Sequence, residues 1–103
     1  MLSATLFADN NFNLSTKHNT LTHCIVKTKE DKYIGLLKFK TIEDFRRICN
    51  GKMLFIYESD KCRIFTMKNM KFNVFIQDKY SKSKFLINET KEVCGKIIIE
   101  SID

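Results

Sequence analysis

The residues that could do chemistry gather in one stretch, KCRIFTMKNMKFNVFIQDKYSKSK, from Lys61 to Lys84. This stretch contains six Lys, one Arg and a single acid, Asp78, so its net charge is 7 − 1 = +6. The whole chain of 103 residues also has a net charge of +6, so the flanking regions together are neutral. Cations clustered in this way attract anionic partners, because neutralising a phosphate backbone releases its counterions.

Aromatic side chains in the same stretch could add a second kind of contact. Phe75 falls among polar residues on one face of a predicted strand, and aromatic rings on a basic surface can stack on unpaired bases. We therefore predict a small non-enzymatic protein that docks on RNA or on a ribonucleoprotein assembly such as a ribosome. The residues predicted to make this contact are Lys61, Arg63, Lys68, Lys71, Phe75, Lys79, Tyr80, Lys82 and Lys84.

Two other interpretations of the basic stretch remain open. Lysines on strand edges can simply protect a sheet from aggregation, and Phe75 can pack under a neighbouring loop. Alternatively, the partner is an acidic protein. The domain is then a protein-interaction module, such as an inhibitor or a complex subunit from a virus or intracellular parasite, and it uses a sheet edge or its Phe-rich face.

Catalytic and metal-binding patterns are missing from the sequence. The chain has no nucleophile elbow, no phosphate-binding Gly-rich loop and no dinucleotide fingerprint, so we expect neither enzymatic activity nor a cofactor. No C-x-x-C pair occurs, and the spacing of the cysteines is unlike that of a zinc site, so we expect no metal. These cysteines are Cys24, Cys49, Cys62 and Cys94.

The cysteines also indicate whether the cellular compartment is reducing or oxidising. All four lie in apolar segments, where free Cys behaves as a small core residue. The N-terminus lacks the basic region and long apolar run of a signal peptide, and no segment approaches the ~18 apolar residues of a membrane span. We therefore predict free thiols, a reducing cytoplasmic location and no membrane partner.

One short amphipathic helix at about 41–50 is the clearest predicted element. Thr41 can cap its start, and Asp44 three residues later completes a capping box. Asn50 and the glycine after it favour a left-handed stop. Apolar residues recur at helical spacing on one side, so Phe45 is expected to anchor the helix to a sheet.

Most other segments predict strands separated by polar turns. KEDK and ESDK would each join two strands in a hairpin, which implies antiparallel pairing. KNMK is a further turn, with Asn69 in a left-handed conformation, and DKYSKSK is expected to form a turn-like loop. The predicted strands are Leu2–Ala8, His23–Thr28, Tyr33–Phe39, Met53–Tyr57, Cys62–Met67, about 71–77, Phe85–Ile87 and Lys96–Ile99.

Together these elements predict a single α+β domain, 1–103, with a polar loop or extended arm at about 9–20. Its sheet would be mostly antiparallel and curved, or a small open barrel, with the one helix packed against it. An oligonucleotide-binding barrel places its single helix between the third and fourth strands, and the predicted order is compatible with that arrangement.

Overall fold

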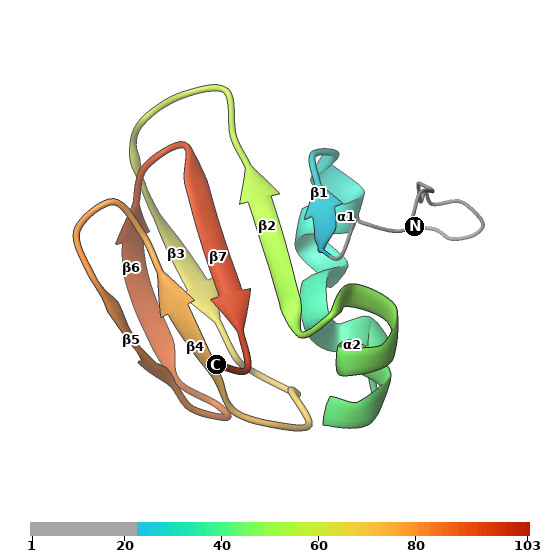
Figure 1. Ribbon diagram of the computed structural model, residues 1–103. Coiled ribbons are helices and arrows are strands. Elements are labelled where there is room, and N and C mark those ends of the chain that lie inside the picture. Colours follow the sequence, from blue (N-terminus) through green and yellow to red (C-terminus); the bar gives the residue numbers. More distant parts are fainter. Residues whose placement is uncertain (1–22) are drawn as a thin grey trace.

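The computed structural model describes residues 23–103, which form two sheets and two short α-helices (Figure 1). The predicted strand Leu2–Ala8 and the predicted arm at about 9–20 lie outside the described residues. The elements in chain order are β1 (Cys24–Val26), α1 (Lys29–Ile34), the 3₁₀ helix η1 (Gly35–Lys38), α2 (Ile42–Cys49), β2 (Lys52–Ile56), β3 (Cys62–Thr66), β4 (Val74–Gln77), β5 (Lys82–Phe85), β6 (Thr90–Cys94) and β7 (Ile97–Ser101).

The larger sheet has five strands in the order β1-β2-β7-β4-β5. It is mixed, because β1 runs parallel to β2 while the other pairs are antiparallel. The smaller sheet is the antiparallel pair β3-β6, and within residues 23–103 the two sheets do not close into one barrel. The helices lie beside β1 and β2, on the side of the molecule away from β5 and β6 (Figure 1). The α+β class is confirmed, whereas an oligonucleotide-binding barrel is not.

The helix predicted at about 41–50 is confirmed as α2. The Thr41 hydroxyl accepts a hydrogen bond from the Asp44 backbone N–H at 3.1 Å, as expected of an N-cap. Asn50 ends the helix in the left-handed conformation, with φ of 55°. Phe45 is fully buried, and its ring lies 5.3 Å from that of Phe39. The predicted anchor therefore holds α2 against the core.

The hairpin predicted around KEDK is wrong, because these residues begin a helix. Thr28 accepts a hydrogen bond from the Asp31 backbone N–H at 3.1 Å and caps α1. Helix α1 continues directly into η1, so the predicted strand Tyr33–Phe39 is helical over most of its length. In the sequence, α1 and α2 both lie between β1 and β2. This helical crossover connection allows the two strands to run parallel.

The hairpin predicted around ESDK is wrong in its pairing. Strands β2 and β3 form at about the predicted positions, but β2 pairs with β7 and β3 pairs with β6. The rings of Phe55 and Phe65 meet edge to face, with centroids 5.1 Å apart, so β3 faces β2 across the core. Strand β2, with apolar residues at four of its five positions, suits the interior of the larger sheet better than a two-stranded hairpin.

The segment predicted as a strand at about 71–77 contains β4, and its alternation of buried and more exposed side chains is confirmed. Phe72, Val74 and Ile76 are buried, and Asn69 has φ of 66° in the preceding turn. The loop predicted for DKYSKSK is only partly correct. Strand β5 begins within it, at Lys82, and pairs with β4.

The prediction of four free thiols is wrong. Cys24 of β1 is bonded to Cys49 at the end of α2, and Cys62 of β3 is bonded to Cys94 of β6. Disulfides form and persist in oxidising compartments. The predicted reducing, cytoplasmic location is therefore corrected to an oxidising environment outside the cytoplasm, such as the extracellular space.

Candidate interaction surface

The basic stretch Lys61–Lys84 is divided between the two sheets. One part belongs to β3 and its ends, one to the loop before β4, and one to the β4–β5 hairpin and its turn. In that order, the predicted contact residues are Lys61, Arg63 and Lys68, then Lys71, then Phe75, Lys79, Tyr80, Lys82 and Lys84.

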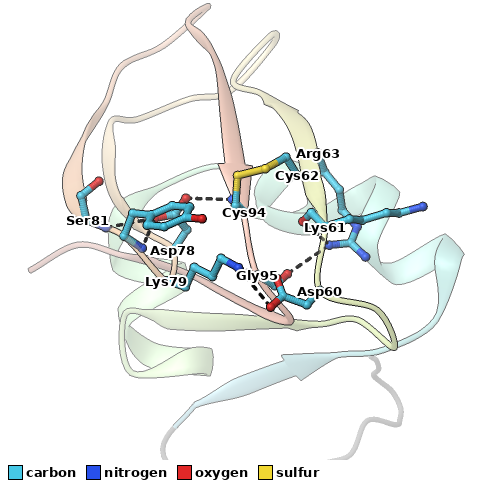
Figure 2. Close-up of a disulfide and its surroundings, with 10 residues drawn as sticks. Asp60, Lys61, Cys62, Arg63, Asp78, Lys79, Ser81, Cys94 and Gly95 are labelled. Atoms are coloured by element: carbon cyan, nitrogen blue, oxygen red, sulfur yellow. Dashed lines mark hydrogen bonds and ion pairs between the residues drawn. A yellow bond between two sulfur atoms is a disulfide. The ribbon is translucent and has the colours of Figure 1, made fainter.

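Arg63 is engaged by the protein itself. Its Nη1 donates to the main-chain oxygens of Lys61 at 3.1 Å and Gly95 at 3.0 Å (Figure 2). Its Nη2 donates to the main-chain oxygen of Ser59 at 2.9 Å. The guanidinium also lies 3.7 Å from the ring centre of Tyr57. Arg63 thus fastens the loop before β3 to the end of β6, and little of its hydrogen-bonding capacity is left for a phosphate.

Lys79 is likewise paired. Its Nζ donates to both carboxylate oxygens of Asp60, at 2.9 and 3.0 Å (Figure 2). The hydrogen bond with Asp60 raises the pKa of Lys79 above its ordinary value. Tyr80, beside it, is 74% exposed and is available to a partner.

Asp78, the only acid of the basic stretch, organises the turn between β4 and β5. Its carboxylate accepts hydrogen bonds from the backbone N–H groups of Tyr80, Ser81 and Cys94, at 2.8, 3.0 and 2.8 Å. Burial opposes ionisation of Asp78, but these backbone donors outweigh it and hold its pKa below the ordinary value. Asp78 therefore has a structural role and joins the hairpin to β6.

The larger sheet has an outer face, opposite the core. Partners in neighbouring strands point to the same face, so the registers define its members. One row of cross-strand partners runs through all five strands and consists of Ile25, Leu54, Ile99, Gln77 and Lys82. The outer face comprises Ile25, Lys52, Leu54, Ile56, Phe75, Gln77, Lys82, Lys84, Ile97, Ile99 and Ser101.

Apolar side chains dominate the outer face. Ile25 and Ile97 are 50% and 49% exposed, and the others are half-buried against one another. Within residues 23–103 no layer of structure covers them. We call this group the outer apolar patch; it consists of Ile25, Leu54, Ile56, Phe75, Ile97 and Ile99.

Lysines border the outer apolar patch. Lys84 pairs with Phe75 across the hairpin, and the Lys82 Nζ lies 5.5 Å from the Phe75 ring centre. Lys82 also donates to the main-chain oxygen of Asp103 at 2.7 Å. Lys52 lies at the other end of the row of cross-strand partners that contains Phe75 and Lys84. None of the outer-face residues is acidic, so the border is positive.

The inner face of the larger sheet contains one ionisable residue whose carboxyl is buried. Glu100 is 4% exposed, and its cross-strand neighbours Met53 and Ile76 are apolar. Burial raises the pKa of Glu100 to about 8, so its carboxyl is mostly neutral at pH 7. The pKa of Tyr57 is raised above its ordinary value by burial, which outweighs the lowering effect of Arg63, and Glu100 raises it further.

A small pocket of about 210 Å³ opens beside the hairpin. Both acidic and basic side chains contribute to its walls, so it shows no preference for an anion. The lining residues are Ile76, Asp78, Ser81, Ser83, Lys91, Glu92 and Val93.

Sequence reasoning missed the outer apolar patch. It singled out Phe75 from the patch but did not single out the isoleucines. The signal was present in MLFI and III, where consecutive residues are apolar and both faces of the strand must therefore be apolar.

The chain matches no protein-family model, no curated protein and no solved structure. None of the helices in residues 23–103 is long and apolar enough to cross a membrane.

Proposed function

We propose that this domain is a protein-interaction module of an oxidising, non-cytoplasmic environment. Its outer face binds an amphipathic helix with acidic flanks on a partner protein. The observation that supports this most is the outer apolar patch, in which Ile25 and Ile97 remain half exposed. Contiguous apolar surface of this kind marks interaction sites in soluble proteins.

The geometry of the patch favours a helix as the occupant. Its aliphatic part lies on β1, β2 and β7, three neighbouring strands. Strands lie about 4.8 Å apart, so the aliphatic part is roughly 10 Å wide, close to the diameter of an α-helix. Sheets that are apolar on both faces are commonly covered by amphipathic helices.

The charge of the border favours acidic flanks on that helix. Lys52 and Lys84 edge the patch, and so does Lys82, whose ammonium also donates to the Asp103 main-chain oxygen. Complementary charges speed association and orient the partner. RNA is less favoured than it was from the sequence, because Arg63 and Lys79 are already paired and the centre of the face is aliphatic.

A designed helical peptide tests this proposal directly. The probe is a capped 18-residue peptide with Leu at helical spacing and Glu on both flanks, and its affinity is measured by fluorescence anisotropy. Ile97→Lys should weaken binding at least tenfold, because it places a charge within the patch, opposite Ile56. Ile64→Lys is the matched control, since Ile64 is 67% exposed on β3 and should leave binding unchanged.

Three outcomes would overturn the proposal. If a scrambled peptide of the same composition binds equally well, the helical face is not recognised. If a single-stranded oligouridine binds more tightly than the peptide and is unaffected by Ile97→Lys, a nucleic acid is favoured. If sedimentation reveals a dimer that Ile97→Lys dissociates, a second copy of the chain covers the face.

A further inference from the structure

We propose that the free edge of β3 is a second docking site, which takes up an extended acidic peptide as an added β-strand. The site lies on the smaller sheet and does not depend on the outer face of the larger one.

The hydrogen bonds at the two ends of the β3–β6 ladder show which way the backbone of β3 points. Gly95 N–H donates to the Lys61 oxygen at 3.2 Å, and Met67 N–H donates to the Glu89 oxygen at 2.8 Å. In an antiparallel pair, hydrogen-bonded and non-hydrogen-bonded positions alternate. The register therefore makes Cys62, Ile64 and Thr66 non-hydrogen-bonded positions. Their N–H and C=O groups point away from β6, toward the free edge.

The equivalent groups on β6 show what a protected edge looks like. The Cys94 N–H donates to the Asp78 carboxylate at 2.8 Å, and the Cys94 oxygen accepts from the Lys79 N–H at 3.1 Å (Figure 2). The turn after β4 thus covers that end of β6. Within residues 23–103, β3 pairs with no strand other than β6.

The side chains of β3 do not protect its free edge from pairing with another strand. Ile64 is 67% exposed, and Cys62 and Thr66 on either side of it are exposed and uncharged. Edge strands are usually protected by lysines, proline or shortness. Strand β5 has Lys82 and Lys84, and β1 has only three residues. Among the strands of residues 23–103, β3 is the long edge without such protection.

The β3 template is held rigid before any peptide arrives. The Cys62–Cys94 disulfide ties it to β6, and the Arg63 guanidinium bonds to the Gly95 oxygen beside it. At its other end, Met67 exchanges hydrogen bonds with the turn after β5, through Asn88 and Glu89. A preordered edge loses little conformational entropy when a strand is added.

Charge identifies the kind of peptide. Lys61 and Lys68 are exposed just beyond the two ends of β3. Lys61 directly precedes the five-residue strand, and Lys68 lies in the turn that follows it, so one cation flanks each end of β3. Glu92, the acid opposite Ile64, belongs to β6 and lies on the far side of β3 from the free edge. A short strand with an acid at each end complements these two cations.

The probe is the capped peptide Glu-Val-Thr-Val-Thr-Val-Glu, titrated into ¹⁵N-labelled protein. We expect the amide signals of residues 62, 64 and 66 to shift and to gain protection from hydrogen exchange. Ile64→Pro removes the outward N–H without removing a bond to β6, and it should weaken binding at least tenfold. Ile97→Lys, which disrupts the outer apolar patch, should leave this affinity unchanged.

Modified peptides keep the test decisive even where Ile64→Pro fails to fold. A peptide N-methylated at all five residues between its two Glu residues has no internal backbone N–H left on either edge, so equal binding of this peptide by the wild-type protein would overturn strand addition. A peptide with Lys in place of both Glu residues should bind at least tenfold more weakly. Equal binding of that peptide would overturn the acidic specificity.

Discussion

The two faces of the larger sheet are both apolar but lie in opposite environments. On the inner face, Met53 and Ile98 are 1% and 0% exposed, whereas on the outer face Ile25 and Ile97 are about half exposed, at 50% and 49%. Each face also holds residues suited to the other, because the carboxyl of Glu100 is buried inside while isoleucines meet solvent outside. The apolar content of a face therefore does not decide whether it is core. What decides is whether the helices and the smaller sheet cover it.

This comparison separates two meanings of hydrophobicity in a small domain. The inner face contributes to folding, so changes there should alter the free energy of unfolding. The outer face contributes to partner recognition, so changes there should alter affinity and leave unfolding nearly unaffected.

Reduction of both disulfides is expected to have the largest effect. The Cys24–Cys49 bond fastens α2 to the inner face, and the Cys62–Cys94 bond joins the two strands of the smaller sheet. Loss of a native disulfide typically costs about 2–5 kcal/mol, so reduction of both should bring the domain close to unfolding. Urea denaturation with and without reductant measures this. A thiol titration in denaturant without reductant should find no free thiols, and four reactive thiols would contradict both bonds.

The neighbouring residues Ile98 and Ile97 give the sharpest test of the two faces. Ile98→Ala should cost about 2–5 kcal/mol, because it leaves a cavity in the core. Ile97→Ala should change the free energy of unfolding by no more than about 0.5 kcal/mol, as is usual at a surface. Chemical denaturation of the two variants provides the measurement. Equal costs would mean that the outer face is covered in the folded chain.

The buried carboxyl of Glu100, on the inner face, should make the free energy of unfolding depend on pH. Its folded pKa of about 8 lies above the ordinary value of 4.5, so between these values the folded carboxyl keeps its proton while the unfolded one loses it. The contribution to stability is therefore fully present below about pH 4.5 and is lost as pH rises toward 8, by up to about 1.4 kcal/mol per pH unit.

Glu100→Gln isolates this contribution, because the amide does not titrate. We expect the wild-type protein to lose stability relative to the variant between pH 5 and pH 8, in urea denaturation series run side by side. Parallel curves for the two proteins would show that the Glu100 carboxyl is hydrated in the folded state.

Phe75→Ala should have only a small effect on folding. Phe75 is half-buried on the outer face, beside Lys84 and the Lys82 ammonium. Its loss should lower the free energy of unfolding by no more than about 1 kcal/mol. A thermal melt measures the change. A cost of about 3–5 kcal/mol, typical of a buried Phe, would place this ring in the core.

Local signals account for the parts of the fold that could be predicted. The Thr41 cap, the Asn50 stop and the apolar spacing all point to α2, and each acts within a few residues. Helix α1 has the same signature, with Thr28 bonded to Asp31, but none of its residues is buried. Without an apolar period, its polar run was mistaken for a turn.

Strand pairing and disulfides depend on contacts far apart in the sequence, so local patterns could not define them. Strand β6, with alternately exposed positions and two charged residues, was not predicted at all. Because β6 rather than β2 is the partner of β3, it also brings Cys94 opposite Cys62. The same limit applies to the outer face. The basic stretch drew attention to Lys82 and Lys84, but the isoleucines they border come from β1, β2 and β7.

The position of β7 has a consequence for the timing of synthesis. This strand lies between β2 and β4 in the larger sheet, yet it leaves the ribosome after every other strand (Figure 1). Until β7 emerges, the β1–β2 pair and the β4–β5 hairpin have no connection through the sheet, and neither is stable alone in water. The five-stranded sheet therefore cannot form before β7 has been synthesised. Until then the inner face has no central strand, and the core that this face helps to build stays open to water.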